Sequence, residues 1–277
     1  MEWDMIKLTD KEFKEMHTFV REKYGINLEN KRVLIEGRLN STLQAKDCRT
    51  FSDYILLLRR DTSGEEITTF LNKITTNLTF FMREPKHFEY LREKILPEQE
   101  KTNTRKTYRI WSAGCSLGAE AYTTLMTLHD YFGARKSLWR TPVLATDISQ
   151  SVLSGAKEAT YKADLLKDIP PAWRTRYFKP VGEKKEEYQV APLICREVEF
   201  KVLNLMDDFH FPYHFNLIFC RNVMIYFDQE TRKRLVNKYY EQLEPGGYLF
   251  IGHSETIPRD ATQFQFIQPA VYRKPPR

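Results

Sequence analysis

The sequence lacks the features that mark several large classes of protein. Its four cysteines are scattered and form no C-x-x-C pair, so neither a disulfide framework nor a zinc site is expected. No apolar run approaches the length of a membrane span, and the N-terminus does not resemble a signal peptide. We therefore expect a cytoplasmic protein that binds no metal ion and does not insert into a membrane.

A strong charge of one sign is also missing. The 277 residues include 43 Lys and Arg and 37 Asp and Glu, and the net charge of +6 favours an acidic partner without requiring nucleic acid. Residues 1–84 are neutral, with 14 basic and 14 acidic side chains. Residues 28–60 hold a local basic excess, so the candidate contacts for an acidic partner are Lys31, Arg32, Arg38 and Lys46. A solvated helix face explains these charges equally well.

Residues 1–76 predict a small helical domain. Capping boxes at Thr9 and Thr50, and a third candidate at Ser63, each precede apolar residues at helical spacing. A further helix is expected from Glu29 to Leu43, where the apolar residues share one side. Four short amphipathic helices of this kind form a bundle.

Residues 107–122 predict the opening of a nucleotide-binding α/β unit, within a domain that spans 107–277. A short apolar strand, a small glycine-containing turn at 113–118 and a run of helix formers from Ala119 follow one another. The turn is not G-x-G-x-x-G, and it lacks the lysine of a P-loop. The pattern therefore argues against a dinucleotide or a triphosphate and leaves room for a smaller adenosine ligand.

Polar residues follow the predicted strands of this domain. Asp147 ends one strand, where an acid can accept hydrogen bonds from both ribose hydroxyls; capping of a helix that starts near Ser149 is the alternative. Arg221 and Asn222 follow the apolar stretch 215–220, which is typical of a central buried strand. Ligands bind at this edge of such sheets.

Two further segments surround this unit. Residues 77–106 are expected to link the domains and cover the ligand, because two aromatics lie beside polar side chains there; a linker whose aromatics fill the joint is the alternative. Within this segment, residues 97–106 look like an exposed loop. Residues 179–202 have the rhythm of short antiparallel strands and predict a small β-subdomain. Residues 264–273 predict a last strand.

Together these stretches resemble the chemotaxis receptor glutamate methyltransferases, the CheR family. The stretches that match are Thr75–Pro85, Ile110–Tyr122, Ala145–Ile148, Asn204-Leu205, Ile218–Asp228 and Pro245–Glu255. Two of them, Cys-Arg-Asn-Val at 220–223 and Gly-His-Ser-Glu at 252–255, are far more specific than any glycine turn.

The resemblance implies a helical N-terminal domain, followed by a Rossmann-like class I methyltransferase domain that bears a small antiparallel β-subdomain. It implies S-adenosylmethionine (SAM) as methyl donor, S-adenosylhomocysteine as product and a receptor glutamate as acceptor, in sensory adaptation. The implied partner is the cytoplasmic helical region of membrane chemotaxis receptors. The protein itself is expected to be a monomer. An ionised carboxylate, with an ordinary pKa of about 4.3, needs no general base to attack an activated methyl group.

The resemblance also implies which residues form the site. The implied cofactor contacts are Asn77, Thr79, Arg83, Glu120, Asp147, Asn204, Leu205, Arg221 and Asn222. Arg83 and Tyr226 match residues beside the transferred methyl group; Arg83 holds either the acceptor carboxylate or the cofactor's own, and Tyr226 is alternatively a core aromatic. Ala119 stands where the family usually has an acid or glutamine. The β excursion lacks a glycine-rich turn, so we expect recognition without a receptor C-terminal tether.

Two other interpretations stay open. A methyltransferase for another acceptor, such as nucleic acid, should show a broad basic patch and a steep salt dependence. A non-catalytic cofactor-sensing or receptor-binding module on the same fold would bind the cofactor without turnover. The presence of Arg83, Glu120, Asp147 and Tyr226 argues against the second interpretation.

Overall fold

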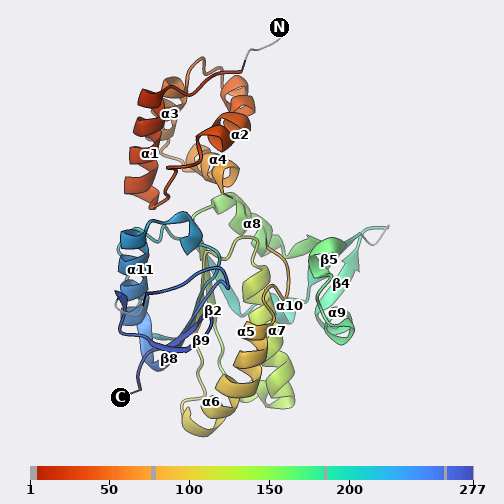
Figure 1. Ribbon diagram of the computed structural model, residues 1–277. Coiled ribbons are helices and arrows are strands. Elements are labelled where there is room, and N and C mark those ends of the chain that lie inside the picture. The colour runs from red at the N-terminus through yellow and green to blue at the C-terminus, as the bar shows by residue number, and fades with distance from the viewer. Residues whose placement is uncertain (1–4, 76–78, 184–185, 259–260, 277) are drawn as a thin grey trace.

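The computed structural model describes residues 5–75, 79–183, 186–258 and 261–276. A bundle of four helices stands at one end of a larger α/β domain, and a small sheet projects from the side of that domain (Figure 1). The expected boundary between 1–76 and 77–106 falls at residues 76–78, which lie outside the described residues. Within the described residues, no helix is long and apolar enough to cross a membrane.

The bundle consists of α1 (Asp10–Tyr24), α2 (Arg32–Ala45), α3 (Phe51–Arg60) and α4 (Glu65–Ile74). The capping boxes at Thr9 and Thr50 are confirmed. Each threonine hydroxyl accepts the N–H of the acid three residues later, and the carboxylate of that acid accepts the threonine N–H. The cap expected at Ser63 is wrong. The Ser63 hydroxyl accepts only the Glu65 N–H, at 3.2 Å, and the Asp61 carboxylate accepts the next two N–H groups of α4, from Glu66 at 2.9 Å and Ile67 at 3.0 Å.

The α/β domain contains a seven-stranded sheet in the order β6-β2-β1-β7-β8-β10-β9. Its strands are β1 (Ile110–Ala113), β2 (Val143–Asp147), β6 (Val198–Val202), β7 (Phe215–Cys220), β8 (Leu243–Ile251), β9 (Gln265–Gln268) and β10 (Val271–Arg273). The first five in spatial order pair in parallel, so their carboxyl ends meet at one edge. The single last strand expected at 264–273 is an antiparallel hairpin that reverses at Ala270, whose φ is 65°.

Helices cover both faces of the sheet. The principal ones are α5 (Lys86–Tyr90), the π-helical turn Leu91–Ile95, α6 (Leu96–Thr102), α7 (Ala119–Phe132), α8 (Gln150–Glu158) and α11 (Gln229–Gln242). One buried cluster joins α11, the bundle and one sheet face, and a second joins α5 to α7 and the other face. Neighbouring residues of β1 divide between them, with Trp111 in the first and Ile110 in the second, as a pleated strand requires.

The loop expected at 97–106 begins only after Thr102, because α6 continues through Pro97. A proline has no N–H to donate to the preceding turn, and the chain widens into the π-helical turn just before it. Proline in the first turn of a helix therefore did not end the helical path here.

The small antiparallel sheet has the order β3-β5-β4, formed by β3 (Thr160–Lys162), β4 (Phe178–Val181) and β5 (Glu187–Val190). It carries α9 (Pro171–Tyr177) and is followed by α10 (Pro192–Cys195). The boundaries 179–202 need correction, because the sheet starts at Thr160 and β6 pairs in parallel with β2 of the large sheet. Strand rhythm alone does not reveal which sheet a strand joins.

Candidate active site

A cavity lies at the carboxyl edge of the parallel strands, where the strand-end loops meet the helical bundle. Nine of the predicted site residues line it: Thr79, Arg83, Glu120, Asp147, Asn204, Leu205, Arg221, Asn222 and Tyr226. Asn77 lies outside the described residues. The residues that follow strands β2, β6 and β7 thus meet at one place, as the edge rule for parallel sheets predicts, and segment 79–83 joins them there.

The turn after β1 lies tightly between its neighbours. The N–H groups of Gly114 and Cys115 both donate to the Thr146 carbonyl, at 2.7 and 2.8 Å, which fixes the turn against the end of β2. Gly114 has a φ of 81°, and an added Cβ would stand 2.4 Å from Val223 Cγ2. Glycine is therefore required here both by backbone conformation and by close approach.

Asp147 stands at the tip of β2 and lines the cavity. Its carboxylate accepts the N–H of Ser116 at 2.8 Å and the N–H of Ser149 at 3.0 Å. Ser149 is itself the N-cap of α8, through its hydroxyl and the Val152 N–H, so capping does not account for Asp147. Burial raises the pKa of Asp147, although these backbone hydrogen bonds oppose the shift. A carboxylate has about four acceptor positions, so these bonds leave acceptor capacity for a ligand.

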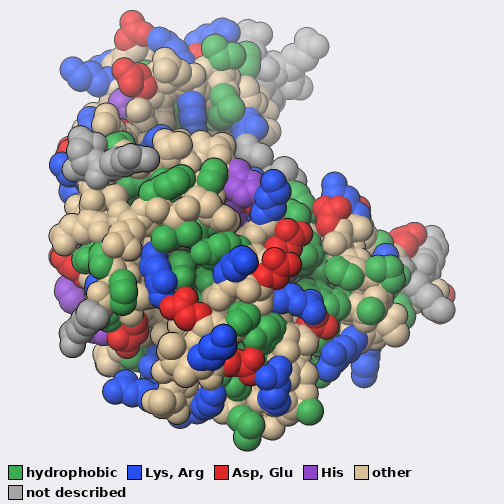
Figure 2. All heavy atoms as spheres, turned by 60° about the horizontal axis from the view of Figure 1, so that its bottom comes forward, with side chains coloured by type: hydrophobic (Ala, Val, Ile, Leu, Met, Phe, Trp, Pro, Cys, Tyr) green, Lys and Arg blue, Asp and Glu red, His purple; other side chains and the backbone are tan. Residues whose placement is uncertain are grey.

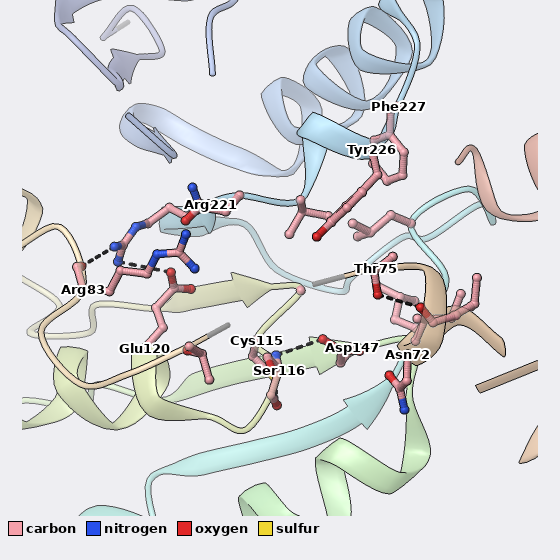
Figure 3. A pocket seen from close by; sticks show the side chains of 18 of the residues that line it. Asn72, Thr75, Arg83, Cys115, Ser116, Glu120, Asp147, Arg221, Tyr226 and Phe227 are labelled. Atoms are coloured by element: carbon pink, nitrogen blue, oxygen red, sulfur yellow. Dashed lines mark hydrogen bonds and ion pairs between the residues drawn. The ribbon is translucent and has the colours of Figure 1, made fainter. Parts of the chain in front are cut away.

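Arg221 forms the centre of a buried charge cluster (Figure 3). Its side chain is 3% exposed and lies 3.1 Å from a Glu84 oxygen and 3.3 Å from a Glu120 oxygen, and it also donates to the Arg83 carbonyl. Ser112 donates to the other Glu120 oxygen at 2.5 Å. Burial raises the pKa of Glu120, because it outweighs the stabilising Arg221 charge and the Ser112 hydrogen bond.

Two carboxylates that the sequence did not single out shape the loop after β7. Glu84 accepts from Arg221, from the Asn222 side chain at 3.4 Å and from the His253 N–H at 3.2 Å. Glu255 is 6% exposed and accepts the N–H groups of Gly252, Asn222 and Ile225, at 2.6, 3.0 and 3.1 Å. Both residues belong to family-matching stretches, which is the signal that could have found them, but side-chain direction is not readable from a motif.

The helical bundle supplies a second wall of the cavity, which the sequence did not predict. Its contributions are Tyr24, Ile26, Leu71, Asn72 and Thr75. Asn204 faces this wall, and its amide donates to the Lys23 carbonyl at 2.8 Å and thereby ties α1 to the loop after β6. Asn204 thus lines the cavity while its amide nitrogen binds the bundle.

The four candidate cations do not form one surface. Arg32 pairs with Asp10, and Lys46 pairs with Glu66, so both are engaged within the bundle. Arg38 donates to the carbonyls of Lys73 and Thr75 at the C-terminal end of α4, at 3.0 and 3.4 Å. Lys31 instead lies against a residue of the cavity wall, with Nζ 4.8 Å from the Tyr226 ring centroid.

Known proteins match both domains. Residues 77–273 match the family model for the CheR methyltransferase SAM-binding domain, and residues 11–75 match that for the CheR methyltransferase all-alpha domain. This chain belongs to the CheR methyltransferase family. The resemblance and the fold class predicted from the sequence are confirmed.

Curated CheR relatives match over nearly their full lengths. The chemotaxis protein methyltransferase of Borreliella burgdorferi is 43% identical over 274 residues, which are 97% of this chain and 96% of that protein. That of Escherichia coli is 34% identical over 272 residues, 97% of this chain and 92% of that protein. The chemotaxis protein methyltransferase 2 of Vibrio cholerae is 32% identical over 276 residues, 98% of this chain and 95% of that protein.

SAM is the cofactor of this CheR fold, and the cavity suits it. Asp147 offers acceptors at a strand tip, and the apolar side chains of Ile148, Leu203 and Leu205 line the same cavity. Glu120 is a buried carboxylate whose ionised form a cationic ligand group would stabilise. When bound, SAM supplies a methyl group already activated on a sulfonium.

The molecular surface bears on the nucleic-acid alternative. On the face that Figure 2 shows, Lys and Arg side chains are interspersed with Asp and Glu and do not form a single basic block. A mixed surface of this kind does not provide the continuous positive field that a nucleic-acid backbone requires.

Proposed function

We propose that this protein transfers methyl groups from SAM to glutamate side chains in the cytoplasmic helical region of chemotaxis receptors, and so forms glutamyl methyl esters and S-adenosylhomocysteine. The observation that carries the proposal is the single cavity that gathers Glu120 and Asp147 with Arg83 and Tyr226. The names of the relatives support chemotaxis as the setting. We further propose that the protein acts in the cytoplasm as a monomer, without metal or nucleic acid.

Each cofactor contact is proposed from the chemistry of its side chain. Asp147 is proposed to accept hydrogen bonds from the two ribose hydroxyls, since its remaining acceptor positions line the cavity. Glu120 is proposed to accept from the cofactor's ammonium group. The further contacts proposed for the cofactor are Asn77, Thr79, Arg83, Asn204, Leu205, Arg221 and Asn222.

Methyl transfer to a carboxylate places few chemical demands on the protein. The acceptor is ionised at neutral pH, with an ordinary pKa of about 4.3, so no proton has to be removed. Among the described residues that line the cavity there is no histidine, and the carboxylates of Glu120 and Asp147 already accept hydrogen bonds from the protein. The task left is alignment and exclusion of water, which in favourable systems lowers a barrier by about 7–11 kcal/mol.

Arg83 and Tyr226 are proposed to position the acceptor. Both line the cavity, and they approach it from different elements, since Tyr226 belongs to the turn after β7 (Figure 3). An arginine that gripped the nucleophile tightly would lower its reactivity, so Arg83 is assigned orientation of the carboxylate and not activation. Tyr226 is assigned a hydrogen bond to the same carboxylate.

The test is transfer of a radiolabelled methyl group from SAM to receptor-containing membranes, followed by base treatment. A methyl ester releases its label in base, so base-labile label on the receptor is the expected result. Arg83→Ala and Tyr226→Phe should both reduce the labelling. In Tyr226→Phe, which removes no proposed cofactor contact, SAM should still protect the protein against thermal unfolding.

Other results would favour a different function. Base-stable label would indicate another acceptor group. SAM binding without any labelled receptor would favour the non-catalytic module. The absence of SAM binding would contradict the whole proposal.

A further inference from the structure

The chain between α1 and α2 crosses from the bundle to the turn that bears Tyr226. We call residues 24–28 the strap. The N–H of Asn27 donates to the Tyr226 carbonyl at 2.8 Å, and Ile26 and Phe227 form an antiparallel β-bridge. Residues about two hundred positions apart are thus joined by backbone hydrogen bonding and not only by side-chain packing.

The strap and the end of α1 just before it are anchored to the methyltransferase domain. Gly25 has a φ of 71°, and an added Cβ would stand 2.4 Å from Met206 Sδ, so the backbone lies directly against the loop after β6. Just before the strap, Arg21 forms a 2.8 Å ion pair with Asp228, the N-cap of α11. The Lys23 carbonyl accepts from Asn204, as described above.

The strap also faces the cavity. Tyr24 and Ile26 line it together with Tyr226 and Phe227. Shortly after the strap, the Lys31 ammonium lies over the Tyr226 ring at 4.8 Å, and this lysine is only partly exposed. The backbone and the ring of Tyr226 are therefore both contacted by the helical bundle.

We propose that the strap is a positioning element for methyl transfer: it fixes the Tyr226 turn, so the helical domain completes the active site of the methyltransferase domain. The inference rests on the proposed function, because it requires a role for Tyr226 in the reaction. Asn27 acts through its backbone N–H, and Lys31 acts through the Tyr226 ring. Neither residue is assigned contact with the reacting atoms.

A matched pair of variants at one position isolates the backbone bond. Asn27→Pro removes the N–H that donates to Tyr226, whereas Asn27→Ala keeps this N–H and removes only the side chain, whose oxygen accepts from the Glu29 N–H at 3.0 Å. We expect kcat for receptor methylation to fall about tenfold or more in Asn27→Pro, since small misplacements of positioned groups cost up to about 100-fold. The Kd for SAM should stay within about twofold in both variants, and Asn27→Ala should remain close to wild type.

A double variant separates positioning from general damage. If the strap acts through Tyr226, then Asn27→Pro should cost little further activity in a Tyr226→Phe background, because contacting residues are not additive. Full additivity of the two losses of kcat would overturn the proposal. A loss of SAM affinity in Asn27→Pro as large as its loss of kcat would also overturn it. Should Asn27→Pro fail to fold, Lys31→Met and Lys31→Arg test the second contact that the bundle makes with Tyr226: kcat should fall in the first and recover in the second, at constant Kd for SAM. Equal kcat in both would overturn the proposal that the helical domain positions Tyr226.

Failure of the proposed function would look different. In that case the wild-type protein would bind SAM yet leave receptors without base-labile label. Hydrogen exchange of residues 222–228 would still report on the strap, since these amides should exchange faster in Asn27→Pro than in Asn27→Ala. Unchanged exchange would contradict the strap whatever the acceptor is.

Discussion

Carboxylates at the two edges of the parallel sheet have opposite properties. At the amino edge, Glu197 just before β6 is bonded by His129 at 2.6 Å, Lys136 at 2.7 Å and Thr141 at 2.8 Å. Burial alone would raise its pKa, but these three partners lower it to about 2. At the carboxyl edge, burial raises the pKa of both Glu120 and Asp147 despite their partners.

The difference shows what each edge contributes. A carboxyl whose pKa is lowered by folding stabilises the folded state above its ordinary pKa, and this stability is lost as the pH falls through the folded value. A carboxyl whose pKa is raised does the reverse: its ionised form is disfavoured in the empty protein, and a ligand that binds the ionised form relieves that cost. Glu197 therefore stabilises the domain. Glu120 and Asp147 instead carry an energetic cost of ionisation that bound SAM would relieve.

The largest expected effect is on cofactor affinity in Glu120→Gln. Loss of a hydrogen bond to a charged group should weaken SAM binding by about 1.5–3 kcal/mol, or roughly 10- to 150-fold. The unfolding free energy without SAM should not fall, because burial disfavours the ionised form of Glu120 and Arg221 keeps its ion pair with Glu84. Calorimetric titration and urea unfolding measure the two quantities. Glu89→Gln, at an exposed position of α5, is the control and should change neither.

Glu197→Gln should show the opposite pattern. The difference between a folded pKa of about 2 and an ordinary value of about 4.3 sets an upper limit of about 3 kcal/mol on its contribution at neutral pH, and partial exposure reduces it. We expect a loss of about 1–3 kcal/mol in urea unfolding, with the Kd for SAM unchanged. A loss of SAM affinity as large as that of Glu120→Gln would remove the distinction between the edges.

The pH dependence should also separate the two edges. As the pH falls from neutrality, Glu120 and Asp147 take up protons earlier than ordinary carboxyls, because their pKa values are raised, and SAM affinity should decline. The contribution of Glu197 to stability should persist until the pH approaches its ordinary range near about 4.3. SAM titrations across this pH range should give a steeper decline in wild type than in Glu120→Gln. Equal slopes would mean that Glu120 stays ionised throughout.

The smallest expected effects concern the cations of the bundle. Reversal of Lys31 and Arg38 to Glu should weaken receptor methylation, and more so at low salt than at high salt. Neutralisation of Arg32 and Lys46 to Gln should change it less, since both already pair with acids of the bundle. The initial rate of label transfer at two ionic strengths tests both pairs. A salt-independent effect at Lys31 and Arg38 would point to local structure in place of electrostatic encounter.

Features set by local contacts or by a general rule of sheet topology were predictable from the sequence. The caps at Thr9 and Thr50 were predictable because each is set by residues three positions apart. The gathering of Asp147 with Arg221 was predictable because parallel strands bring their carboxyl ends to one edge.

The features that the sequence did not predict depend on contacts between distant segments. Glu255 belongs to a stretch that matches the family, but its three backbone bonds depend on how the chain turns after β8. The strap contacts a turn about two hundred residues away, and no local pattern encodes that contact. The edge assignment of β6 likewise depends on its partner β2 and not on its own sequence.

The most direct test is to measure the unfolding temperatures of wild type, Glu120→Gln and Glu197→Gln, each with and without saturating SAM. If the two edges divide binding from stability, Glu197→Gln will unfold at lower temperature in both conditions and keep the full rise that SAM produces. Glu120→Gln will start no lower than wild type and lose most of that rise. The reverse pattern, with the SAM-induced rise lost in Glu197→Gln and kept in Glu120→Gln, would contradict the division.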